Sequence, residues 1–200
     1  MNLQFLGDAL DHWKGSVFET LQQESALRDF LVDPMASDAP VWKPADSQLF
    51  ARLLRIEQRQ LVSHSHDLCR DRAQYFAEIP SMGDLFLDPD TGIKTGHVTR
   101  IEQYLLPTEL FEAMDRGQER VVVVYQHVRA KRTRERVEEV LAALNEKDRQ
   151  FYCTSYESGT VALLFLSRHR SRIGAVRDCF LQFLGAHASN RIGYWNGHAV

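Results

Sequence analysis

The 200-residue chain carries a formal net charge of −3, and its apolar and charged fractions, 44% and 26%, are ordinary for a globular protein. This length predicts one domain, 1–200, with enough apolar surface for a substantial core. The net charge argues against a wholly basic nucleic-acid binder but leaves local basic patches open.

The cysteines Cys69, Cys153 and Cys179 are far apart and form no C-x-x-C pair. An odd, scattered count predicts reduced thiols in a cytoplasmic protein rather than a disulfide framework or a zinc site. The sequence opens with no basic and apolar leader and holds no apolar run long enough to cross a bilayer, so we expect neither secretion nor membrane association.

Hydrophobic spacing predicts helices and strands in alternation. The N-terminal segment 1–25 is expected to be helical, with Asp8 or Asp11 as the N-cap. Expected strands follow at 28–32, 60–63, 85–87, 120–127, 150–156 and 160–167. Further helices are expected at 46–54, through 75–76 until Pro80, and at 107–117, 129–144 and 171–184. The C-terminal tail 185–200 is expected to be a loop or a frayed end.

This order predicts an α/β sandwich with a mostly parallel sheet that ends in a β-hairpin at 150–167. The hairpin turn is expected at Glu157-Ser158-Gly159.

The segment after the apolar run 85–87 is the first candidate site. It reads Asp88-Pro89-Asp90-Thr91-Gly92, and ligands of open α/β sheets bind beyond the carboxyl ends of such strands. Two carboxylates at this spacing could orient a substrate amino group, or bind a divalent cation through oxygen. A helix-capping aspartate in an ordinary loop is the alternative.

Two further candidates lie on either side of this loop in the sequence. Asp11 and Lys14 share a helix face close to Asp8, where an exposed ion pair is the alternative to a binding role. His127 ends a strand of consecutive valines, with Tyr125 on the same face. It could act as a general base, a proton shuttle or a metal ligand, or be structural.

A basic segment begins just beyond that strand. Its members, which could contact the phosphates of a nucleic acid, are Arg129, Lys131, Arg132 and Arg134. A solvated helix face explains such a charge run equally simply. The sequence contains no G-x-S-x-G, P-loop, H-E-x-x-H or G-x-G-x-x-G motif, which removes the common hydrolase, P-loop and glycine-rich dinucleotide functions.

The segment Gly7-Asp8-Ala9-Leu10-Asp11-His12-Trp13-Lys14 resembles the N-terminal motif of DPPY-type adenine-N6 methyltransferases that act on ribosomal RNA. The loop Asp88-Pro89-Asp90-Thr91 resembles their Asp-Pro-Pro-Tyr loop. The chain is also similar to a group of uncharacterised bacterial and prophage proteins with a G-D…D-x-x-K start, a D-P-D-[NT]-G loop and a later Y-Q-H.

The resemblance implies a Rossmann-like class I methyltransferase fold with S-adenosylmethionine near Asp8, Asp11, Lys14 and Asp33, and a target amino group received at Asp88 and Pro89. The chain departs from the pattern at two points. Asp33-Pro34-Met35-Ala36-Ser37 contains no glycine, and Asp90 and Thr91 replace the second proline and the stacking aromatic of the loop.

Three functions follow as hypotheses. The first is a divergent S-adenosylmethionine-dependent methyltransferase that acts on nucleic acid, with Asp88, Pro89, Asp90 and His127 as catalytic residues. The second is a nuclease or phosphodiesterase that uses Mg²⁺ or Mn²⁺ at Asp88 and Asp90. The third is a non-catalytic accessory binding protein on the same scaffold.

Overall fold

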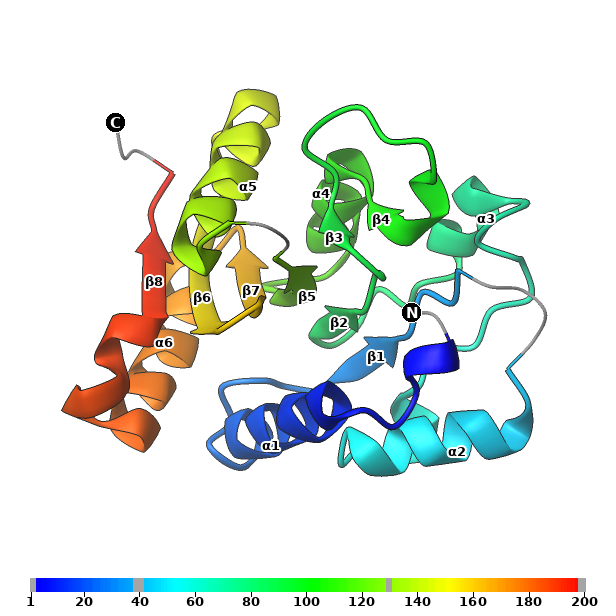
Figure 1. Ribbon diagram of the computed structural model, residues 1–200, viewed down its shortest axis with the longest axis horizontal. Coiled ribbons are helices and arrows are strands. Elements are labelled where there is room, and N and C mark those ends of the chain that lie inside the picture. Colours follow the sequence, from blue (N-terminus) through cyan, green and yellow to red (C-terminus); the bar gives the residue numbers. More distant parts are fainter. Residues whose placement is uncertain (1–2, 38–41, 129–130, 198–200) are drawn as a thin grey trace.

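The chain folds into three layers, with a six-stranded sheet between two groups of helices (Figure 1). The computed structural model describes residues 3–37, 42–128 and 131–197. The strands are β1 (Leu31–Asp33), β2 (Leu85–Leu87), β3 (Gly92–Ile93), β4 (Tyr104–Leu105), β5 (Val122–His127), β6 (Tyr152–Ser158), β7 (Val161–Ser167) and β8 (Ile192–Trp195). The α-helices are α1 (Ala9–Gln23), α2 (Pro44–Leu53), α3 (Arg72–Ala77), α4 (Pro107–Arg116), α5 (Thr133–Lys147) and α6 (Arg170–Leu184). The 3-10 helices are η1 (Leu3–Phe5), η2 (Gln58–Gln60), η3 (Ile101–Gln103) and η4 (Ala186–Arg191).

The strand order in the main sheet is β1-β2-β5-β7-β6-β8. Strands β1, β2 and β5 are parallel neighbours, and β7 runs antiparallel to both β5 and β6. The edge strand β8 is antiparallel to β6. Strands β3 and β4 form a separate parallel pair. The expected α/β class is confirmed, in a mixed sheet.

Helices α1, α2 and α6 cover one face of the sheet, and α3, α4 and α5 cover the other (Figure 1). Alternate residues of β2 serve the two cores: Phe86 packs in the core beneath α1, whereas Leu85 and Leu87 pack in the core beneath α4. Burial on both faces explains why this strand is a continuous apolar run rather than an alternating one.

The C-terminal tail is not merely a loop or a frayed end. Its described part contains η4 and the strand β8, which pairs with β6 through registers such as Cys153–Trp195 and Tyr156–Ile192. The strand is short, and its apolar side chains are only partly buried against the two cores, so it leaves no periodic pattern in the sequence. The β6–β7 pair therefore does not end the sheet.

The strand expected at 60–63 is also wrong. Gln60 ends η2, and its side-chain amide donates to the Phe30 carbonyl at 2.7 Å. Leu61 contributes a single parallel bridge to Val32. The short strand β3, in which Gly92 and Ile93 pair with β4, is not among the expected strands. Two-residue strands are too short for a periodic signal.

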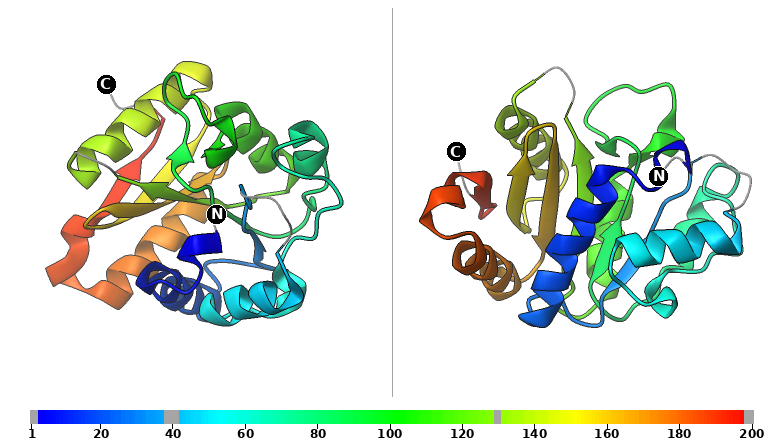
Figure 2. Two further views of the ribbon diagram at one scale, coloured as in Figure 1. Left: turned by 45° about the vertical axis from the view of Figure 1, so that its right-hand side comes forward. Right: turned by 60° about the horizontal axis from the view of Figure 1, so that its bottom comes forward.

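The carboxyl ends of β1, β2 and β5 meet at one edge of the sheet, and the first turn of α1 lies beside them (Figure 2). The candidate residues Asp33, Asp88 and His127 end or directly follow these three strands. No helix in the described ranges is long and apolar enough to cross a membrane.

Candidate functional site

A buried ammonium group joins the first helix to the end of β2. Lys14 places Nζ 2.9 Å from Oδ1 of Asp11 and 2.8 Å from Oδ2 of Asp88, and all three side chains are buried. Asp11 lies one turn earlier on α1, and Asp88 directly follows β2. The alternative of an exposed ion pair between Asp11 and Lys14 is therefore wrong.

For the pKa of Lys14, the attraction to the two carboxylates has a larger combined effect than the burial of the ammonium group. Burial by itself lowers the pKa of the ammonium group, but Asp88 and Asp11 together raise it above its ordinary value. Burial raises the pKa of Asp88, an effect that Lys14 opposes. The ammonium nitrogen of Lys14, 2.8 Å from Oδ2, favours the ionised form of the Asp88 carboxylate.

The backbone at the start of α1 fixes the two aspartates that precede Lys14. Asp8 is the N-cap, and its Oδ1 accepts hydrogen bonds from the amides of Leu10 at 2.8 Å and Asp11 at 3.2 Å. Oδ2 of Asp11 accepts from the Gly7 amide at 2.9 Å. The positive end of the helix dipole stabilises both carboxylates. Asp8 is thus confirmed as the cap.

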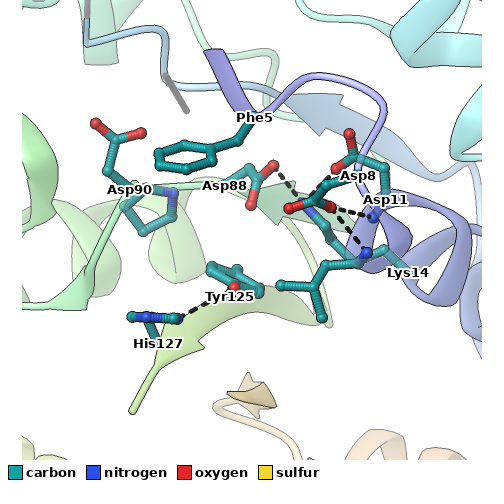
Figure 3. A pocket seen from close by; sticks show the side chains of 10 residues that line it. Phe5, Asp8, Asp11, Lys14, Asp88, Asp90, Tyr125 and His127 are labelled. Atoms are coloured by element: carbon teal, nitrogen blue, oxygen red, sulfur yellow. Dashed lines mark hydrogen bonds and ion pairs between the residues drawn. The ribbon is translucent and has the colours of Figure 1, made fainter. Parts of the chain in front are cut away.

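A cavity of about 180 Å³ opens beside this cluster (Figure 3). Its acidic residues are Asp8, Asp11, Asp88 and Asp90, and its aromatic rings are Phe5, Tyr125 and His127. Among the described residues that line the cavity, Lys14 is the only basic side chain apart from His127. This excess of carboxylates favours a positively charged or amino-bearing group and disfavours a phosphate.

Tyr125 and His127 form one wall of the cavity. The Tyr125 hydroxyl lies 3.4 Å from Nδ1 of His127, and the Lys14 ammonium lies 4.8 Å from the Tyr125 ring centroid. Burial is the largest influence on the pKa of Tyr125 and raises it; Lys14 opposes this shift, and the nearby carboxylates add to it, namely Asp88, Asp8 and Asp11. The phenol therefore stays protonated. Its oxygen can accept a hydrogen bond from Nδ1–H of His127, and in that tautomer Nε2 of the partly exposed ring is the nitrogen that can take up a proton.

The loop after β2 is tied to β5 by a buried amide. Oε1 of Gln126 accepts from the Ile93 amide at 2.9 Å, and its Nε2 donates to the carbonyls of Thr91 at 3.2 Å and His127 at 2.9 Å. Gly92, at φ +117°, packs directly on this side chain. The D-P-D-[NT]-G and Y-Q-H segments are therefore in direct contact.

Gln126 is a residue whose role the sequence motif did not reveal. The sequence did contain a signal for this role: Gln126 is a side-chain amide in a largely apolar, buried strand, and a buried amide must find hydrogen-bond partners. Phe5 was missed as well, because a single phenylalanine near the start of the chain gives no pattern.

Asp90 and Asp88 both line the cavity, but their side chains point in different directions (Figure 3). Ser37, in the segment after β1, donates its hydroxyl to Oδ2 of Asp90. Within the described ranges, no three His, Cys, Asp or Glu side chains form a group that could hold a metal ion.

Asp33 lies at the end of β1, but its carboxylate is used inside the protein. Oδ1 accepts from the Met35 amide at 2.9 Å and from the Tyr75 hydroxyl at 2.5 Å, and Oδ2 lies 3.0 Å from Nε2 of His64. The Asp33 side chain is fully buried and does not line the cavity that contains Asp88. His64 and Tyr75, whose rings stack at 3.6 Å, instead line a separate cavity of about 410 Å³.

The basic segment is partly neutralised by acidic neighbours. Lys131 pairs with Glu139, and Arg134 lies 3.1 Å from a carboxylate oxygen of Glu157. The Arg132 side chain is 89% exposed, with Glu135 at 3.9 Å. Arg129 lies outside the described residues. The exposed Arg132 is thus the best placed of the described candidates for contacting a phosphate.

Comparison with known proteins gives a distant structural likeness. No family model matches the chain, and no curated protein matches it. Among solved structures, the crystal structure of protein LPL1258 from Legionella pneumophila str. Philadelphia 1, a DUF519 protein, is similar at a TM-score of 0.42 and 13% identity. The match covers 83% of this chain and 58% of LPL1258.

Proposed function

We propose that this protein is a divergent methyltransferase-like protein that transfers a methyl group from S-adenosylmethionine to an amino group of a nucleic acid. The observation that carries the proposal is the position of Asp88. A buried lysine holds this carboxylate at the carboxyl end of β2, on the wall of an acidic and aromatic cavity. Such an acceptor suits an amino group that must be oriented for attack.

The fold supports the proposal in a limited way. The resemblance implies a class I methyltransferase sheet with a C-terminal β-hairpin, and β6 and β7 are antiparallel neighbours. Strand β1 pairs directly with β2, and β2 pairs with β5. The first helix and the Asp88 loop, which would correspond to the two site segments of that fold, therefore lie at the same end of the sheet.

The cavity fits S-adenosylmethionine in its charge. The cofactor carries a sulfonium and an ammonium group, and Asp8, Asp11 and Asp90 would hold such cations at the cavity wall. When bound, it would supply an electrophilic methyl group. Asp33 does not fit this role, because its carboxylate is enclosed by Met35, Tyr75 and His64.

The chain's own residues would perform the remaining steps. Lys14 fixes the direction of the Asp88 carboxylate, which would accept a hydrogen bond from the target amino group. His127 would take up the proton that this amino group loses, with Tyr125 beside its Nδ1. The apolar side chain of Leu10 would help to exclude water from the cavity.

The metal-dependent nuclease is less well supported than the methyltransferase. Asp88 is engaged by Lys14, Asp90 by Ser37, and the described residues offer no three-ligand group. The non-catalytic alternative has one observation in its favour, which is the internal use of Asp33 where the resemblance implies a cofactor contact.

Calorimetric titration with S-adenosylmethionine tests the proposal. We expect micromolar binding, and weaker binding of S-adenosylhomocysteine, which lacks the sulfonium charge. The Asp8→Asn variant keeps a good N-cap but loses one carboxylate, so it should bind the cofactor more weakly without unfolding. Binding of neither ligand would contradict the proposal.

A second titration with Mg²⁺ and Mn²⁺ separates the alternatives. Metal binding that Asp88→Asn and Asp90→Asn abolish, without cofactor binding, would favour phosphodiester chemistry. If the cofactor binds, transfer of its labelled methyl group to RNA should be lost in Asp88→Asn. Silence in every titration would leave the non-catalytic function.

A further inference from the structure

Phe5 is an exposed aromatic ring on the wall of the candidate site. Its side chain is 56% exposed, and it belongs to neither of the two buried hydrophobic clusters. It lines the same cavity as Asp88, Pro89 and Asp90. A single exposed apolar side chain needs no explanation by itself; it is the position of Phe5 on the wall of the cavity that contains Asp88 that indicates a binding role.

The backbone around Phe5 is held in a defined position relative to α1. The Phe5 carbonyl accepts from the Asp8 amide at 3.1 Å, and the Leu3 carbonyl accepts from the Leu6 amide at 3.0 Å. Gly7 turns the chain into the helix at φ +92° and donates to Oδ2 of Asp11. The ring is therefore presented from a hydrogen-bonded turn that is coupled to the Asp11–Lys14–Asp88 cluster.

The rings of Tyr125 and His127 lie across the cavity from Phe5 (Figure 3). Their planes differ by 24° and their centroids are 6.3 Å apart. A planar group that reached Asp88 would thus pass between aromatic surfaces from two distant parts of the chain. Such surfaces stack on nucleobases, since every base has a π-face.

The Asp88 loop itself offers no ring at the position where the resemblance expects one. Thr91 stands there, and its carbonyl accepts from the His127 amide at 3.1 Å and from Nε2 of Gln126 at 3.2 Å. A short, hydrogen-bonded threonine cannot stack on a base. An exposed ring on the cavity wall comes from η1 instead, as Phe5.

We propose that Phe5 is the stacking residue for the target base, supplied by the segment before α1 in place of the missing loop aromatic. This proposal rests on the proposed function for the target class, an unpaired amino-bearing base in a single strand. Phe5 is a positioning residue that acts in substrate binding and not in cofactor binding.

The test uses a short single-stranded RNA that carries one 2-aminopurine, whose fluorescence falls when the base stacks. Phe5→Leu keeps an apolar side chain and removes the ring, and Phe5→Trp keeps a ring. We expect Phe5→Leu to weaken binding about tenfold and to abolish most of the quenching, and Phe5→Trp to retain both. Phe183→Leu, at a 65% exposed position on α6, is the matched control and should behave as the wild type.

Calorimetry with S-adenosylmethionine on the same variants separates this proposal from the proposed function. Unchanged cofactor affinity in Phe5→Leu, with weaker RNA binding, is the expected result. RNA binding and quenching that match the wild type in Phe5→Leu, or wild-type protein that never quenches the probe, would overturn the role of Phe5 even if the cofactor binds. Ring-dependent RNA binding without cofactor binding would support Phe5 and contradict the methyltransferase proposal.

Discussion

Gly92 lies directly against the side chain of Gln126, which comes from a distant segment of the chain, and no side chain fits between the two residues. A Cβ atom built on Gly92 would lie 2.4 Å from Oε1 of Gln126, and Gly92 has a φ of +117° that other residues rarely adopt. The glycine is therefore a requirement of the Gln126 hydrogen bonds that shape the Asp88 loop.

The Gly92→Ala variant tests this requirement. We expect its free energy of unfolding to fall by about 1–3 kcal/mol from backbone strain alone, and further because the new Cβ atom clashes with Gln126. Urea denaturation measures the change. Gly96→Ala is the matched control: a Cβ there meets nothing within 4 Å, so its stability should stay within about 0.5 kcal/mol of the wild type. Equal stability of both variants would show that the loop can move away from Gln126.

The Lys14→Met variant tests the buried ion-pair cluster. Removing the ammonium leaves Asp11 and Asp88 buried without their shared partner, and we expect a loss of about 3–5 kcal/mol in urea denaturation at pH 7. Part of this loss should be recovered at lower pH, because protonation relieves the two buried carboxylates.

The exposed pair of Arg55 and Glu19 supplies the control for Lys14. Both of its side chains are more than 40% exposed. Arg55→Met should therefore cost no more than about 1 kcal/mol. A similarly small cost for Lys14→Met would mean that the two carboxylates find other partners or water.

The local parts of this site could be predicted from the sequence. The strand 85–87 is a short apolar run followed by Pro89, and Asp8 precedes an amphipathic helix, so both positions follow from nearby residues. The hydrophobic pattern also predicted a strand at the position of β5 and a helix that overlaps α5. Each of these signals lies within about ten residues of the feature that it predicts.

The non-local parts could not be predicted. Asp33 ends β1, and Asp88 directly follows β2. The Asp33 carboxylate is nevertheless enclosed by Tyr75 and His64, which come from a segment with no recognisable motif. The strand β8 likewise depends on its pairing with β6 rather than on its own residues. Contacts between distant segments decide these outcomes, and a single sequence records them only weakly.

Protonation of His64 should make stability depend on pH. Burial lowers the pKa of this histidine, but hydrogen bonding to Asp33, with the charges of Asp33 and Glu78, raises it above the ordinary value of 6.5 overall. The folded protein therefore binds this proton more tightly than the unfolded chain does. The contribution to stability is full below pH 6.5 and is lost as the pH rises through the folded pKa.

Urea denaturation at a series of pH values from 5.5 to 8.5 measures this effect. The free energy of unfolding should fall across the upper part of the range, with a slope for one proton of at most about 1.4 kcal/mol per pH unit. His64→Gln should flatten that part of the profile. His66→Gln, which alters a more exposed histidine beside the same Glu78, should leave most of the slope in place. A slope that survives His64→Gln would assign the titration to another group.

Arg132 should be the main phosphate contact of the described basic segment if the protein binds single-stranded nucleic acid. Its side chain is 89% exposed, whereas Lys131 and Arg134 are held by Glu139 and Glu157. Arg132→Gln should weaken RNA binding on the order of fivefold at 0.1 M salt and reduce the salt slope by about 0.7, the value for one contact to a single strand.

Fluorescence anisotropy at several salt concentrations gives both quantities for Arg132→Gln. Arg59→Gln removes an arginine on η2 whose side chain is also highly exposed, and this variant should change neither the affinity for RNA nor the salt slope. Arg134→Gln should have a smaller effect than Arg132→Gln, because breaking the pair with Glu157 offsets part of what a phosphate would gain. An unchanged slope in Arg132→Gln would leave this segment as a solvated helix end, and RNA would then have to bind through the aromatic cavity with other basic residues at its rim.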